Sequence, residues 1–340
     1  MRLISAFAAL LLPLYAHAFS PSGLRFEYKD WELACDNSGT CRAAGYYAVG
    51  GDKLPISILL TRKAGPKSTV SAQIMLELSY GASAGKLALE LKINDKPYDQ
   101  VRIDPSSMIG ELSLAQVDAL LASLPRHANI GLNTKSDAWQ ISDLGAAAVL
   151  LKMDEYQGRI GTPGALVNKG TRPEASVPPA MPLPTVIRAK YAKPQPGDAQ
   201  FLNSYRNTLL DTLRSTVSNE NCGDLQAGSE AQPDLKVQRL SARQMLVSTQ
   251  CWAGRDVGRG FWIVNQKPPF LPILISTEIT DVQEPELMRT LKGAGDYWQQ
   301  RTYTWDGNKF QITEESVTGS SRPMKAGGGW TLPTVVTNVR

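Results

Sequence analysis

The four cysteines of this 340-residue chain restrict its fold more than any other feature. In an oxidising compartment an even number of cysteines predicts disulfide bonds, and four cysteines allow three pairings. The spacing favours Cys35 with Cys41 and Cys222 with Cys251, which places one bond in each half of the chain. The chain-entropy model assigns about 2.4 kcal/mol to the short loop and about 3.6 kcal/mol to the longer one. Either contribution is large beside a domain stability of ~5 to 15 kcal/mol.

The first cysteine pair encloses a turn. Residues 36–39 read Asp-Asn-Ser-Gly, and these types tolerate the left-handed backbone of tight turns. Strand-like residues precede Cys35 and follow Cys41, so we expect a hairpin that the disulfide clamps beside Trp31. A redox pair is the alternative, but active dithiols usually have CxxC spacing at the start of a helix. A four-cysteine zinc site would also need paired CxxC-type spacings, which the sequence lacks.

The first 18 residues have the pattern of a secretory signal peptide. Arg2 precedes an apolar run over residues 3–15, and Ala-His-Ala follows at 16–18. The apolar run is too short to span a bilayer, and Pro13 interrupts it. Later in the chain, no stretch offers about 18 uninterrupted apolar residues. We therefore expect a leader over residues 1–18 and a periplasmic protein that does not span the membrane after cleavage, with secretion as the alternative.

The periodicity of apolar residues predicts an α+β fold with two domains. Residues 19–161 and 199–340 each read as mainly antiparallel β-sheet with one or two packed helices. Over residues 87–93, leucine and isoleucine alternate strictly with other residues, which is typical of a half-buried strand. Residues 162–198 contain eight prolines and predict an extended, semi-rigid linker. A ligand for a proline-recognition module is the alternative interpretation of that segment.

Local signals predict the individual elements. Helices are expected over 114–124 with Ser113 as N-cap, from Ser142 or Asp143 to 157, and over 198–217. The turn at residues 306–308 predicts a hairpin that sets Tyr303 and Trp305 opposite Phe310 and Ile312. Further strands are expected over residues 56–62, 71–80, 98–103, 129–134, 236–240, 243–252, 258–265 and 269–276.

Catalytic motifs are scarce. His127 would be the only histidine after removal of the leader, so a serine triad would have to use it as the base, and no GxSxG elbow is present. The sequence also lacks HExxH, GxxxxGK[ST] and DxDxDG patterns. We therefore expect neither a metal nor a cofactor. The formal charge is only +4, and acidic and basic residues are interspersed without a basic stripe, which argues against a nucleic-acid partner.

Carboxylates are the main catalytic alternative. Glycoside hydrolysis needs only two acids held about 5 to 9.5 Å apart. The candidates that the sequence leaves unplaced are Asp154, Glu155, Glu278, Asp281, Glu314 and Glu315.

Tryptophans are the main candidates for binding. Amphipathic aromatic side chains often line recognition surfaces for proteins or sugars. For each of them, filling a small core is the alternative. The candidates lie near cysteines, strands or turns and are Trp31, Trp252, Trp262, Trp305 and Trp330.

The stretch WELACDNSGTCRAAGY resembles a bacterial exported family known as domain of unknown function 1176 in its Trp, CDN turn, second Cys and AxGY tail. The resemblance extends through the CW at 251–252, YTWDGNKF and GGGWTLPT. It implies export and paired disulfides and supplies no catalytic residue. The family often has a further cysteine near SVTGSSR, where this chain has Ser320 and Ser321. The first half is also distantly similar to invasion-associated locus B proteins, in its Trp, its paired cysteines and a small helix after a hairpin.

Together these features predict a non-catalytic binding or envelope-support protein whose partner is an unknown envelope protein or glycan. One alternative is a carboxylate-dependent hydrolase of cell-wall or glycan substrates. The other is a virulence-related host-contact factor, which rests on the likeness to invasion-associated locus B proteins alone.

Overall fold

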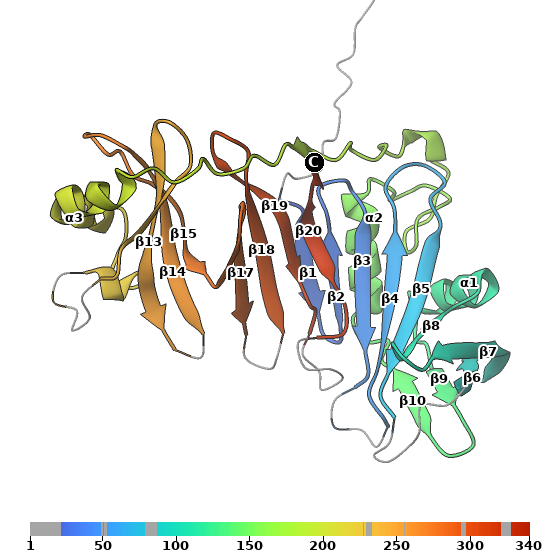
Figure 1. The fold of residues 1–340 in the computed structure, drawn as a ribbon. Helices are drawn as coiled ribbons and strands as arrows, with labels where there is room; N and C mark the ends of the chain where they lie inside the picture. Colours follow the sequence, from blue (N-terminus) through green and yellow to red (C-terminus); the bar gives the residue numbers. More distant parts are fainter. Residues whose placement is uncertain are drawn as a thin grey trace, which may run out of the picture.

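The computed structural model describes residues 22–48, 50, 53–78, 87–226, 228, 233–254, 256–293, 297–320 and 328–340. The predicted leader and Ser321 lie outside these residues. In the described part of the chain most strands are antiparallel and few helices accompany them, which confirms an α+β fold (Figure 1).

One ten-stranded sheet contains the strands of the first half, in the order β1-β2-β3-β4-β5-β8-β7-β6-β9-β10. Helix α2 (Ala146–Tyr156) packs against β1, β2 and β3, and α1 (Leu114–Ser123) packs against β5 and β6. The alternation over residues 87–93 buries Leu89, Leu91 and Ile93, so the predicted strand is confirmed. The strand bounds are β1 Leu24–Tyr28, β2 Trp31–Cys35, β3 Cys41–Tyr46, β4 Ile56–Arg62, β5 Val70–Leu76, β6 Leu87–Ile93, β7 Lys96–Asp104, β8 Ile109–Glu111, β9 Ile130–Asn133 and β10 Ala138–Ile141.

The disulfide of the first half closes the β2–β3 hairpin. Cys35 and Cys41 are register partners, and both sulfurs are buried. Asp36 organises the turn, because its Oδ1 accepts hydrogen bonds from the amides of Ser38 and Thr40 at 2.9 and 3.2 Å. Gly39 takes a φ of +88°, which glycine adopts without strain.

Of the three described α-helices, α1 alone begins at a side-chain cap. Ser113 caps α1 as predicted, in a capping box in which its hydroxyl accepts from the Gln116 amide and Gln116 Oε1 accepts from the Ser113 amide. Helix α2 instead begins at Ala146, later than predicted. The two expected caps are used elsewhere: Ser142 Oγ donates to Asp30 Oδ2, and Asp143 Oδ2 accepts from the Ala128 amide.

The second half contains a four-stranded and a five-stranded sheet. Helix α3 (Asp198–Arg214) packs on one face of the four-stranded sheet, and the Cys222–Cys251 disulfide lies in that core. A separate core joins the two sheets. The predicted hairpin is confirmed, because Tyr303 pairs with Ile312 and Trp305 pairs with Phe310. The bounds are β12 Lys236–Arg239, β13 Gln244–Ala253, β14 Val257–Asn265, β15 Ile273–Ile279, β16 Asp281–Gln283, β17 Glu286–Lys292, β18 Trp298–Trp305, β19 Phe310–Val317 and β20 Leu332–Val336.

The segment between α2 and α3 changes character along its length. Within residues 159–177 only Arg159, Thr162, Ala165 and Val177 are buried, and a 3₁₀ turn covers Glu174–Ser176. Residues 178–197 are extended and mostly exposed, and they run along the top of the molecule in Figure 1. Within them, β11 (Thr185–Val186) pairs in parallel with β21 (Asn338–Val339).

The end of the chain returns to the first half. Strand β20 lies against β2, and Trp330 and Leu332 are buried in the core of the ten-stranded sheet. Trp330 Nε1 donates to Ser57 Oγ at 2.7 Å. The buried Glu32 carboxylate accepts hydrogen bonds from the Tyr46 hydroxyl and the Ser320 amide. The last strands therefore join both halves of the molecule.

Candidate functional site

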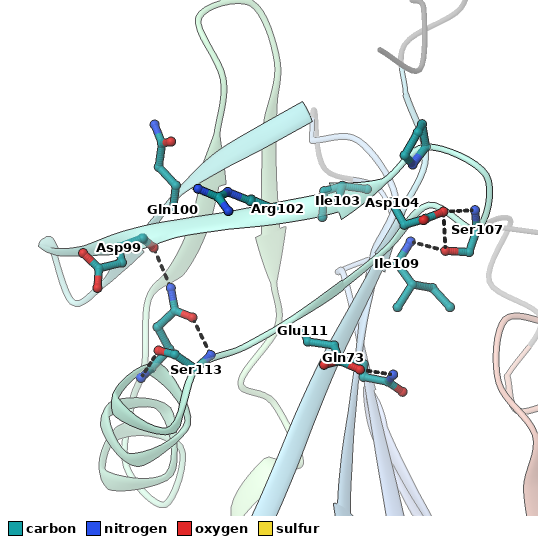
Figure 2. Close-up of a pocket in the computed structure, with 12 residues that line it drawn as sticks. Gln73, Asp99, Gln100, Arg102, Ile103, Asp104, Ser107, Ile109, Glu111 and Ser113 are labelled. Atoms are coloured by element: carbon teal, nitrogen blue, oxygen red, sulfur yellow. Dashed lines mark hydrogen bonds between the residues drawn. The ribbon is translucent and has the colours of Figure 1, made fainter. Parts of the chain in front are cut away.

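A groove of about 1150 Å³ lies where β7 and β8 diverge. Figure 2 shows Asp99, Gln100 and Arg102 on β7 at one side, with Gln73 on β5 and Glu111 on β8 at the other. The start of α1 closes one end. Because it is concave and polar side chains from several elements converge on it, the groove is the candidate binding site.

The groove exists because β8 is short. Strand β8 pairs with β5 along all three of its residues but with β7 only at Ile103 and Asp104. Strand β7 continues to pair with β6 as far as Lys96. Where β7 and β8 still touch, Gly110 is required, because a Cβ there would lie 2.8 Å from the Arg102 carbonyl oxygen.

One edge of β7 is therefore open. Between Lys96 and Arg102, no strand among the described residues pairs with the edge that faces α1. At Asp99 a side chain takes the place of a strand, since Gln116 Nε2 donates to the Asp99 carbonyl oxygen at 2.5 Å. This bond fixes the distance between the helix start and the strand.

The groove is polar and carries an excess of negative charge. Three carboxylates line it, from Asp99, Asp104 and Glu111, against the single guanidinium of Arg102. Gln73 Nε2 lies 3.4 Å from Glu111 Oε1. Of the described residues that line the groove, none is aromatic.

Asp104 belongs to the turn between β7 and β8. Hydrogen bonds from the Ser106 hydroxyl and from the amides of Ser107 and Ser106 lower the pKa of Asp104 to about 2. This carboxylate stays ionised at neutral pH and is unsuited to act as a general acid. Its role is to close the turn.

We expect an NMR titration to find a pKa of about 2 for Asp104, and the Ser106→Ala variant to move this pKa toward the usual value of about 3.9. Because the folded pKa lies below the unfolded one, the turn contributes stability above the unfolded pKa and loses it as the pH falls toward 2. An unchanged pKa in the variant would show that the hydroxyl contact is not its cause.

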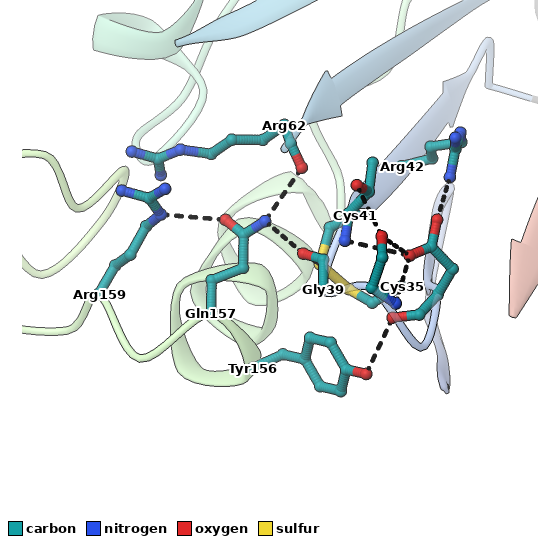
Figure 3. The surroundings of a disulfide bond; sticks show 11 residues. Cys35, Gly39, Cys41, Arg42, Arg62, Tyr156, Gln157 and Arg159 are labelled. Carbon is teal, nitrogen blue, oxygen red and sulfur yellow. Dashed lines mark hydrogen bonds and ion pairs between the residues drawn. A yellow bond between two sulfur atoms is a disulfide. The ribbon is translucent and has the colours of Figure 1, made fainter. Parts of the chain in front are cut away.

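A second cluster of charged groups lies beside the first disulfide (Figure 3). Arg62 Nη1 is 3.2 Å from Asp154 Oδ1, and both side chains are almost fully buried. Gln157 Nε2 donates to the carbonyl oxygens of Gly39 and Arg62 at 2.9 and 3.0 Å. Arg159 Nε donates to Gln157 Oε1 at 3.1 Å.

The cluster fixes the segment that leaves α2. Arg62 Nη2 donates to the Gly164 carbonyl oxygen, and Asp154 Oδ2 accepts from the amides of Leu166 and Val167 at 2.6 and 3.0 Å. Arg159 Nη1 also lies 3.5 Å from Glu174 Oε2. Because these charges bind backbone groups and one another, we assign the cluster a structural role.

Of the six carboxylates singled out in the sequence, four form ion pairs and two are exposed. Asp154 is held by Arg62, and Glu155 Oε2 is 2.9 Å from Lys152 Nζ. Glu278 on β15 and Glu315 on β19 each pair with an arginine at 2.6 Å, Arg289 and Arg301 respectively. Those two arginines are register partners, so the four charges form a row across β15, β17, β18 and β19. Asp281 and Glu314 are exposed on β16 and β19.

The five tryptophans lie mainly inside the protein. Trp31, Trp262, Trp305 and Trp330 are at most 5% exposed, and Trp252 is partly buried. Several indoles donate to internal acceptors: Trp31 to the Ser142 carbonyl oxygen, Trp262 to Thr216 Oγ1 and Trp252 to the Thr277 carbonyl oxygen. The four buried rings therefore fill cores.

His127 lies on the surface. Its side chain is fully exposed, and Nδ1 is 3.3 Å from Asp143 Oδ2. The neighbouring Ser142 hydroxyl donates to Asp30. Across the described ranges, no group of three or more His, Cys, Asp or Glu side chains is placed to hold a metal ion. No helix there is long and apolar enough to cross a membrane.

The groove residues Asp99, Gln100, Arg102 and Glu111 were not singled out in the sequence. The polar positions of residues 98–103 alternate with buried Val101 and Ile103, which indicates a strand with one solvated face. That pattern carries no sign of the open edge, because the open edge depends on where β8 ends.

Comparison with known proteins identifies the family. Residues 25–337 match the model of a family described as protein of unknown function (DUF1176). The chain belongs to this family. It is also 26% identical over 342 residues to the uncharacterized protein YpfG of Escherichia coli (strain K12), with 92% of each chain covered. No solved structure matches the chain. The predicted resemblance to DUF1176 is confirmed, and the likeness to invasion-associated locus B proteins stays a prediction.

Proposed function

We propose that this DUF1176 protein is an exported, non-catalytic binding or envelope-support protein of the bacterial periplasm, and that the groove beside β7 is its binding site. The groove itself carries the proposal: it is a concave surface to which three strands and a helix start contribute polar groups. The two disulfides support an oxidising compartment. The pattern of residues 1–18 supports export through a cleaved leader.

We also propose two structural units, 19–161 and 199–340, with 162–198 as a proline-rich spacer between them. The core between α3 and the four-stranded sheet is separate from that of the ten-stranded sheet, which supports this division, and Val317, Trp330 and Leu332 of the second unit pack into the core of the first. The exposed stretch 178–197 is the part of the spacer that a protease would reach first. Cleavage that begins instead inside the ten-stranded sheet would contradict the division.

A carboxylate-dependent hydrolase is the second candidate, because Asp99 and Glu111 line the same groove. Two acids on opposite sides of a groove are the minimum that glycoside hydrolysis requires. Turnover of a cell-wall glycan that is lost in both Asp99→Asn and Glu111→Gln would favour this candidate. A host-contact role would require the protein at the cell surface or outside, and detection only in the periplasm would exclude it.

The binding proposal is tested by capture from an envelope extract. The oxidised chain without residues 1–18 is immobilised as wild type, as Glu111→Arg and as Glu90→Arg. Glu90 is an exposed acid on β6 outside the groove, so its reversal is a matched control. We expect a protein or glycan that binds wild type and Glu90→Arg and is lost from Glu111→Arg. Equal retention by all three chains would show that the groove is not the site.

A further inference from the structure

We propose that the groove binds an extended, basic polypeptide segment, which adds as a strand to the open edge of β7. This inference rests on the proposed function and names the class of ligand. The free backbone edge, the local charge and the start of α1, which closes one end of the groove, support it.

The backbone of β7 offers hydrogen bonds toward the groove. The Asp99 carbonyl oxygen points to this side, because Gln116 Nε2 donates to it. The Arg102 carbonyl oxygen points to this edge as well, because a Cβ on Gly110 of β8 would lie 2.8 Å from it. Between Asp99 and Arg102 the register shifts, and Val101 pairs with Leu89 of β6 on the opposite edge. Beyond Arg102, Ile103 forms the contact with β8. An incoming strand would thus pair with β7 from the point where the pairing of β8 with β7 ends.

Strand addition is a standard mode of peptide recognition, in which backbone bonds give affinity and side-chain contacts give specificity. Gln116 already makes one such bond from outside the sheet. The bond marks the end of the available edge, so only a short segment of three or four residues fits beside Gln100–Arg102. At about 3.3 Å per residue, such a segment spans roughly 10 to 13 Å.

The charge of the groove selects a basic segment. Three carboxylates and one guanidinium leave an excess of two negative charges around the edge. Lysine or arginine side chains at alternate positions would lie on one face of the added strand, near Asp99 and Glu111. Complementary charge of this kind raises the association rate and disfavours acidic partners.

The groove fits a peptide better than a sugar. Only a polypeptide can continue the backbone hydrogen-bond ladder along the edge of β7, and none of the described residues that line the groove offers an aromatic ring on which a sugar could stack. The shape also disfavours pairing with the sheet of a second molecule. The start of α1 and strand β8 flank the edge, and such cover is how proteins protect edge strands from other sheets.

The test uses a pool of fluorescent heptapeptides of the pattern Lys-X-Lys-X-Lys-X-Lys, with the oxidised chain lacking residues 1–18. Matched probes are the same pool with N-methyl groups at alternate residues, the pool with glutamate in place of lysine, and a chito-oligosaccharide. We expect the lysine pool to bind. Loss of two backbone hydrogen bonds in the methylated pool should weaken binding about tenfold or more. The acidic pool should bind at least about tenfold more weakly, because the groove carries excess negative charge.

Variants separate this inference from the proposal on which it rests. Glu111→Arg should weaken binding of the lysine pool about tenfold, and Glu90→Arg should leave it unchanged within about twofold. Equal binding of methylated and unmethylated pools would overturn strand addition. Binding of the chito-oligosaccharide alone, with the same sensitivity to Glu111→Arg, would overturn the peptide and keep the groove as the site. If no probe binds and Glu111→Arg also leaves envelope capture intact, both proposals fail.

Discussion

Replacing Arg62 with methionine is expected to lower the free energy of unfolding by about 3 to 5 kcal/mol. Methionine keeps an unbranched stem of similar length and removes the guanidinium that lies 3.2 Å from Asp154. The buried carboxylate would then keep the amides of Leu166 and Val167 as hydrogen-bond donors and the more distant charge of Arg159. The carbonyl oxygens of Ser68 and Gly164 would also lose their donor. Chemical denaturation followed by circular dichroism measures the loss.

Lys152→Met is the matched control, because Lys152 lies on the same helix as Asp154 and its pair with Glu155 is exposed. Exposed pairs of this kind contribute about 0 to 1 kcal/mol. If Arg62→Met lowered the free energy of unfolding no more than Lys152→Met, the ion pair of Arg62 with Asp154 would not have the structural role assigned to it.

The loss in Arg62→Met should also depend on pH. Burial raises the pKa of Asp154, against the two backbone amides and the charge of Arg62. Without Arg62 this pKa rises further above its unfolded value. A carboxyl group whose pKa is higher in the folded than in the unfolded state stabilises the fold most at a pH below the unfolded pKa. This stabilisation is lost as the pH rises through the folded pKa. The variant should therefore be closer to wild type near pH 4 than at pH 7, and the opposite order would contradict this explanation.

Removing the second disulfide should have an effect of similar size. The bond joins residues 29 apart in the sequence, and for a loop of this length the chain-entropy model gives about 3.6 kcal/mol. Both sulfurs are buried in the core between α3 and the four-stranded sheet. We expect the Cys222→Ala/Cys251→Ala double variant to unfold at a clearly lower denaturant concentration than wild type.

The Cys35→Ala/Cys41→Ala double variant provides the comparison. These two cysteines are only 6 positions apart in the sequence, and for the short loop between them the same model gives about 2.4 kcal/mol. Alanine avoids placing a hydroxyl in either core. The expected order is a larger loss for the second pair, and a reversed order would mean that native packing outweighs loop entropy.

Local structure was predictable where one signal acts over a few residues. The alternation at 87–93 identified β6, Ser113 identified the start of α1, and the turn at 306–308 identified the β18–β19 hairpin. The pairing of the cysteines also followed from their spacing. The start of α2 was predicted too early, because Ser142 and Asp143, its expected caps, bind other partners in the fold.

The candidate site was not predictable in the same way. It depends on the position of β8 between β5 and β7 and on the three-residue length of β8, and neither has a periodic signature. The return of the last strands to the first half, where Trp330 donates to Ser57, is likewise set by residues 273 apart. Such long-range contacts leave no trace in the composition or spacing of one sequence. Burial of the tryptophans was also not predictable, because an aromatic residue near a turn has the same sequence pattern whether its ring is buried or exposed.

The most direct measurement is photo-crosslinking in living cells with a benzophenone amino acid placed in the groove. The reporter replaces Gln73 or Gln100 in separate strains, because these uncharged side chains line the groove, and a third strain carries it at Glu90, which is exposed outside the groove. A binding groove predicts irradiation-dependent adducts from positions 73 and 100 and none from position 90. Absence of adducts from both groove positions, or the same adducts from position 90, would contradict the claim that this groove is where the protein binds.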